Sequence, residues 1–128
     1  MDLDRMREIL RSLALAHGLT DADLNAYNED ADEFEWNINW NSNLTESFVG
    51  DMTRLEVAAN LYEAALKKGD RLTAKAGLIR MGVQLHNLEG LFNSLRRDVE
   101  KAYLDVRFDW PQFPDENWKI PQEYNFKE

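Results

Sequence analysis

Oxygen-bearing side chains recur at alternate positions in residues 21–32, as they do in calcium-binding loops. The five that match ligand positions of an EF-hand loop are Asp21, Asp23, Asn25, Glu29 and Asp32. The match fails at Ala26, where that loop requires Gly, and at its last position, where Asp is too short to chelate as Glu does. Thr20 followed by Asp23 explains the same residues as a capping box, with Asp in place of the usual Glu or Gln. The sequence therefore predicts a helix start followed by an acidic loop, without calcium.

A second candidate for chemistry is the pair His86 and Glu89, which lie one helical turn apart. Metal sites in helical bundles use Glu-x-x-His pairs on two helices together with further Glu residues. Here the order is reversed, and the chain's other histidine is His17. We interpret His86 as a partly buried packing residue and predict no metal and no cofactor.

Catalytic motifs are absent from the sequence. It contains no serine-nucleophile motif, no phosphate-binding glycine loop and no dinucleotide fingerprint. Carboxylate pairs for acid–base work could arise by chance among the 24 acids, but nothing distinguishes one pair. We predict that the protein is not an enzyme.

The stretch between Arg11 and Arg54 has no Lys or Arg and carries nine acids. Such a stretch projects a negative field that favours basic partners, and the aromatic residues within it are of the type that dominates interfaces. The residues predicted to bind a partner are Asp21, Asp23, Glu29, Asp30, Asp32, Glu33, Glu35, Trp36 and Trp40. The alternative interpretation is that the acids only solubilise one face and the rings only cover the helices.

Composition excludes several classes of protein. At 128 residues with 44% hydrophobic content, the chain has the size and the apolar content of one folded domain. It lacks cysteine, so disulfides and thiolate metal sites are excluded. The first residues lack a signal-peptide pattern, and no apolar run reaches the roughly 20 residues of a membrane span. A net charge of −9 argues against direct binding to nucleic acid. We expect a cytoplasmic protein, in a cell or an infected host, without a membrane partner.

Apolar spacing predicts helices over residues 3–17, 20–27, 45–68 and 71–106. The clearest signal is a seam of nine apolar residues at 3-4 spacing on the last helix: Leu78, Met81, Leu85, Leu88, Phe92, Leu95, Val99, Ala102 and Val106. Gly69 marks a short turn before that helix, so the two long helices are predicted to pack antiparallel. Together with helix 3–17 they form a three-helix bundle, and the predicted class is all-α.

The segments on either side of the hairpin have other patterns. In the acidic and aromatic segment 28–43, Phe34, Trp36, Ile38 and Trp40 alternate with polar residues, which predicts a short strand and at most a minor β pairing. Residues 107–128 contain all three prolines, and five aromatic residues fall within residues 110–126. Proline forbids a regular helix there. We expect an extended tail that runs along the bundle with its rings in grooves, beside residues 34–40, within one domain of residues 1–128.

Three functional hypotheses follow. The first is an acidic interaction module that inhibits a partner by occupying its basic, nucleic-acid-binding surface. In size, acidity and lack of motifs the chain resembles small phage-encoded nucleic-acid mimics and some nuclease immunity proteins, which implies an anti-CRISPR, anti-restriction or nuclease-immunity role. The second is a structural, assembly or adaptor protein that forms a homodimer through its long helix. The third is a helical-bundle metal protein or enzyme.

Overall fold

A computed structural model describes residues 2–30, 33–37 and 42–127. Its elements in chain order are α1 (Leu3–Ala16), α2 (Asp21–Leu24), β1 (Tyr27–Asn28), β2 (Glu33–Phe34), α3 (Leu44–Lys67), α4 (Arg71–Leu104) and the short 3-10 turns η1 (Val106–Phe108) and η2 (Gln122–Tyr124). The all-α class is confirmed. The helix bounds match the sequence-based bounds to within two residues, except for α2, which is a single turn.

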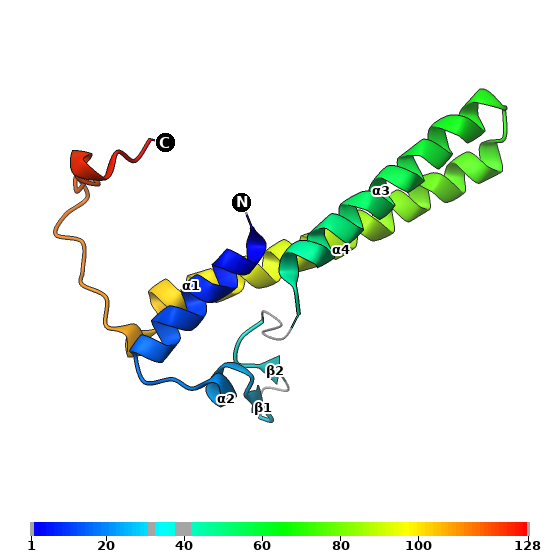
Figure 1. Cartoon of the computed structure of the whole chain (residues 1–128). Helices are drawn as coiled ribbons and strands as arrows, with labels where there is room; N and C mark the ends of the chain where they lie inside the picture. The colour runs from blue at the N-terminus through cyan, green and yellow to red at the C-terminus, as the bar shows by residue number, and fades with distance from the viewer. Residues whose placement is uncertain (1, 31–32, 38–41, 128) are drawn as a thin grey trace.

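α3 and α4 form a long antiparallel hairpin that projects from the rest of the chain (Figure 1). Gly69 reverses the chain in the left-handed region, at φ +72°, where a side chain would be strained. The side chains of Asn43 and Asp70 accept hydrogen bonds from the backbone N–H groups of Glu46 and Thr73, and they thereby cap the starts of α3 and α4.

Small residues line the contact between the two long helices near the hairpin tip. Ala58 and Ala65 of α3 are buried there, as are Ala74 and Gly77 of α4. A Cβ atom added at Gly77 would lie 3.1 Å from the backbone nitrogen of Tyr62 and 3.2 Å from the carbonyl oxygen of Ala58. The helices therefore approach so closely that even a methyl group at position 77 would require the facing backbone to shift by a few tenths of an ångström.

This packing confirms Leu88, Leu95 and Ala102 of the predicted seam of α4 as buried and corrects five of its nine positions. The buried residues of α4 are Ala74, Gly77, Leu88, Leu95, Asp98 and Ala102. Leu78, Leu85, Phe92 and Val99 of the predicted seam are 38–51% exposed, and Val106 is 90% exposed. Apolar residues follow two adjacent stripes of α4, and the stripe with the smaller residues faces α3 because it allows the closer approach.

α1 packs against the end of the hairpin that is distant from its tip (Figure 1). Leu10 of α1 joins Leu44, Leu95 and Ala102 in one buried cluster. Asp4 accepts hydrogen bonds from the backbone N–H groups of Leu44 and Thr45, at 2.8 and 3.3 Å. The hairpin-based three-helix bundle is confirmed, with α1 covering one end of the hairpin.

A second cluster joins the head of the molecule, residues 17–37, to α1 and to η1. Its buried members are Ala14, Leu24, Trp36 and Phe108. The strand predicted around residues 34–40 is much shorter in the structure: β2 pairs Glu33 and Phe34 with β1, and residues 35–37 follow without a strand. Ile38 and Trp40 lie outside the described residues. The ring of Trp36 packs against the ring of Phe108, and this tertiary contact takes the place of the strand that the alternating apolar pattern predicted.

The expectation that the tail runs along the bundle with its rings in grooves is wrong beyond Trp110. Phe108 is buried against Trp36 and His17, and the indole Nε1 of Trp110 donates to the carbonyl oxygen of Ala102 at 2.7 Å. Asp109 then turns the chain at φ 47°, and the tail leads away from the helices (Figure 1). We call residues 109–127 the C-terminal arm.

Candidate functional site

The predicted acidic site divides into acids that form hydrogen bonds or ion pairs within the fold and acids that lie in the turn between β1 and β2. Arg11 forms a bidentate pair with Asp21, with nitrogen–oxygen distances of 2.9 and 3.0 Å, and this hydrogen bonding lowers the pKa of Asp21. Asp23 accepts from the backbone N–H of Thr20 at 2.7 Å, which lowers its pKa and completes the capping box. Both acids therefore hold α2 in place.

Glu35 and Trp36 attach the head to α4. The ammonium group of Lys101 donates to the carbonyl oxygen of Glu35 at 2.8 Å and to its carboxylate at 2.9 Å. The same ammonium lies 5.3 Å from the centre of the Trp36 ring. Trp36 is 3% exposed, so in the free chain it is a core residue.

The predicted acids that face solvent lie at the tip of the head. Glu29 and Asp30 are exposed in the turn between β1 and β2. Asp32, Trp40 and the side chain of Glu33 lie outside the described part of the chain. A role of these residues in partner binding stays a prediction.

Sequence reasoning missed Asp98, which is fully buried on α4. It accepts hydrogen bonds from the backbone N–H of Asn37 at 2.7 Å and from its side-chain nitrogen at 3.3 Å. A buried carboxylate must have such partners, because its transfer out of water is costly. The sequence does contain a signal for this burial. Asp98 stands at 3-4 spacing with Leu91, Leu95 and Ala102, in a stripe whose other residues are small or apolar.

In the described part of the chain, the residues considered for metal binding do not form a set of metal ligands. His86 is exposed, so its interpretation as a partly buried residue is wrong. His17 contacts the carbonyl oxygen of Leu13 through Nδ1 at 2.9 Å and the edge of Phe108. Within residues 2–30, 33–37 and 42–127, no three His, Cys, Asp or Glu side chains are grouped as a metal ion would require. The same residues include no helix that is both long and apolar enough for a membrane span.

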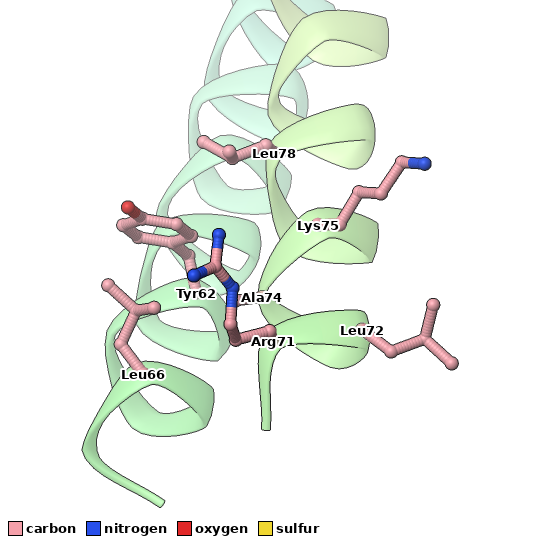
Figure 2. Close-up of a pocket in the computed structure, with 7 residues that line it drawn as sticks. All are labelled: Tyr62, Leu66, Arg71, Leu72, Ala74, Lys75 and Leu78. Carbon is pink, nitrogen blue, oxygen red and sulfur yellow. The ribbon is translucent and has the colours of Figure 1, made fainter. Parts of the chain in front are cut away.

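The hairpin exposes large apolar side chains that sequence reasoning placed in the core. Near its tip, a shallow pocket is lined by residues of both helices (Figure 2): Tyr62, Leu66, Arg71, Leu72, Ala74, Lys75 and Leu78. In Figure 2, Leu78 points toward α3, whereas Leu72 and Lys75 point away from it. The outer side of α4 is therefore a separate surface from the contact with α3.

The C-terminal arm is the second apolar surface. Its exposed large side chains are Trp110, Phe113, Trp118, Ile120, Tyr124 and Phe126, at 42–74% exposure. Beyond Trp110, the hydrogen bonds and ring contacts of the described arm residues are local, such as the tilted contact of Phe113 with Trp118 at 5.1 Å. Trp110 and Phe113 thus lie beside the end of α4, where they line a pocket with Tyr103 and Leu104, and the later rings of the arm face solvent.

Comparisons with known proteins identify a structure of similar fold but no matching family. No protein-family model matches the sequence, and no curated protein matches it. The crystal structure of a functionally unknown protein from Neisseria meningitidis MC58 is similar, with a TM-score of 0.74 and 17% sequence identity. The match covers 93% of this chain and 98% of that one. It therefore extends beyond the hairpin to most of the molecule, and at this identity it shows a shared fold alone.

Proposed function

We propose that the protein is a non-enzymatic binding module that binds a partner protein through its C-terminal arm. The observation that supports this is the exposure of six large apolar side chains on an arm that leads away from the helices. A tail that stayed in solvent would not be expected to carry so many rings. Large aromatic side chains are the residues that most often supply binding energy in protein interfaces.

The partner that we propose has a basic surface of the kind that binds nucleic acid, and the protein would inhibit it by occupying that surface. The arm carries four acids, Asp109, Asp115, Glu116 and Glu123, against two lysines. Glu29 and Asp30 add exposed negative charge at the tip of the head. Acids around apolar anchors speed the encounter with a basic partner and help to select it. Anti-defence or nuclease-immunity activity is the specific form of this proposal.

The test is affinity capture from the native host at low and high salt, read by mass spectrometry. Three baits are compared: the wild-type chain, a Phe113→Ala/Trp118→Ala arm variant and a Val57→Ala control. Val57 is 63% exposed on α3, away from the arm. We expect the wild type and the control to retain a basic, salt-sensitive partner. Loss of two aromatic anchors should weaken that complex by more than about tenfold.

A second readout checks the charge and the inhibition. A Glu29→Lys/Asp30→Lys variant should lose capture of the partner at low salt, whereas the amount captured at high salt should change little. The captured partner's binding to DNA should fall when the wild-type chain is added. If the arm variant captures the same proteins as the wild type, the arm is not the binding surface. If DNA binding by the partner is unchanged at low salt, inhibition through a basic surface is wrong.

A further inference from the structure

Five residues on one side of α4 form a pattern that is nearly symmetric about a central glycine and has opposite charges at its two ends. Lys75, Leu78, Gly82, Leu85 and Glu89 stand at 3-4 spacing, so they share one side of the helix. We call these five residues the Gly82 face. A cation begins it, an anion ends it, and two leucines flank the central glycine.

The Gly82 face is open at its centre in the single chain, whereas Leu78 at its edge points toward α3 (Figure 2) and is only half-exposed. Leu78 and Leu85 are 50% and 51% exposed, although they belong to the longest apolar pattern in the sequence. A Cβ atom added at Gly82 would meet nothing within 4 Å. Lys75 points away from α3 in Figure 2, and neither Lys75 nor Glu89 has an ion-pair partner in the described part of the chain.

We infer that the occupant of this face is a second copy of the same chain, packed antiparallel with a two-fold axis at Gly82. A two-fold axis there places residues equally distant from Gly82 opposite one another. Lys75 and Glu89, each seven positions from Gly82, then form two ion pairs across the interface. Leu78 lies four positions before Gly82 and Leu85 three positions after it, so the two are within one residue of standing opposite. Leu78 of each copy can therefore pack on Leu85 of the other, and the two glycines let the helix backbones approach closely.

The self-complementary charge selects this occupant over an unrelated helix. In a parallel arrangement of two copies, Lys75 would face Lys75 and Glu89 would face Glu89, which opposes pairing. The antiparallel arrangement satisfies both charges and covers both leucines. It also leaves the arm free, because the arm begins beyond α4 at the end of the hairpin distant from its tip (Figure 1).

A single cysteine tests the position of the axis, because the chain has none of its own. Helices that pack about 8–10 Å apart bring Cα atoms at a two-fold axis within the range that a disulfide spans. A Gly82→Cys variant should therefore form a covalent dimer under mild oxidation.

Gly90→Cys is the matched control, since Gly90 is an exposed glycine of the same helix with equal space for a Cβ atom. In the proposed dimer its two copies lie on the order of 24 Å apart. We expect cross-linking at position 82 to be at least tenfold faster than at position 90. Equal rates would show that the axis does not lie at Gly82.

Charge exchange tests the pairing in the intact chain. By sedimentation equilibrium, we expect the wild type to dimerise at roughly tens of micromolar. Lys75→Glu and Glu89→Lys should each weaken the dimer about five- to tenfold, because each puts like charges opposite one another twice. The double variant should return to within about twofold of the wild type. A double variant as weak as the single ones would overturn the ion pairing, and a monomeric wild type at 100-micromolar concentration would overturn the dimer.

The outcome is separable from that of the partner proposal. The Phe113→Ala/Trp118→Ala variant should dimerise as the wild type does, because its changes lie on the arm. Helical circular dichroism of every variant shows whether the chain has folded. Each of the two proposals can therefore fail while the other holds.

Discussion

Single carboxylates and amides fix where the helices of this protein begin. Asp2 caps α1, Asn43 caps α3 and Asp70 caps α4, in each case by accepting a hydrogen bond from the backbone N–H of a nearby residue. Asp4 does so between elements, because it stands on α1 and accepts from the first residues of α3. Part of the net negative charge of the chain therefore stabilises its helix starts, at positions outside the acidic stretch that was predicted to bind a partner.

The hydrogen bonds to these caps make stability depend on pH. The backbone N–H of Leu44 is the largest cause that lowers the pKa of Asp4 below 3.8, and the pKa of Asp70 is lowered by its hydrogen bonds from Thr73. A carboxyl whose pKa is lower in the folded chain stabilises that chain above its unfolded pKa. The contribution is lost as the pH falls through the folded pKa. The melting temperature should therefore fall as the pH is lowered below about 4.

An Asp4→Asn variant isolates one of these groups. At pH 7 it should melt below the wild type, because the charged acceptor for two N–H groups is gone. At pH 3 the difference should shrink, because the pH is then below the unfolded pKa of a carboxyl and the stabilisation by the charged form of Asp4 is decreasing. Differential scanning calorimetry at both pH values measures this, with Glu29→Gln as the exposed control. An equal difference at both pH values would mean that the charge of Asp4 does not stabilise the fold.

At the scale of elements, two glycines of α4 have opposite roles. Gly77 lies in the contact with α3, where an added Cβ atom would meet the backbone of Tyr62 and Ala58. Gly90 is exposed, and an added Cβ atom there would meet nothing within 4 Å. Glycine lowers helix stability at both positions, so the surroundings decide the effect of a substitution.

We expect Gly90→Ala to raise the free energy of unfolding by about 0.5–1 kcal/mol, through helix propensity alone. Gly77→Ala should lower it by about 1–2 kcal/mol, because a backbone contact cannot move aside as a side-chain end can. Urea unfolding followed by circular dichroism measures both. If the two variants are stabilised alike, the close approach of α3 and α4 at Gly77 is wrong.

At the scale of the whole molecule, the chain combines a helical body with an arm that the body does not hold. The helices share two buried clusters, whereas the arm beyond Trp110 contributes no residue to either cluster. Segments with few buried contacts open at low free-energy cost and are cut first by proteases.

Limited proteolysis should show this division. Chymotrypsin should cut first within residues 113–126, where exposed aromatic residues lie outside the helices. The helical circular dichroism signal should remain, because α1, α3 and α4 stay intact. Mass spectrometry of the early fragments identifies the site. First cleavage within residues 44–104 would contradict a stable hairpin with a loosely held arm.

The sequence alone determined the helices, the hairpin turn and the all-α class, because periodicity, caps and Gly69 act locally. The three prolines of residues 107–128 also indicated that this segment does not form a regular helix. Tertiary structure decided which apolar stripe of α4 is buried, since both stripes are apolar and only the one with Ala74 and Gly77 lets α3 approach. It likewise decided that Trp36 is buried while the rings of the arm are exposed. Burial depends on neighbours distant in sequence, and spacing along one chain does not encode which neighbours those are.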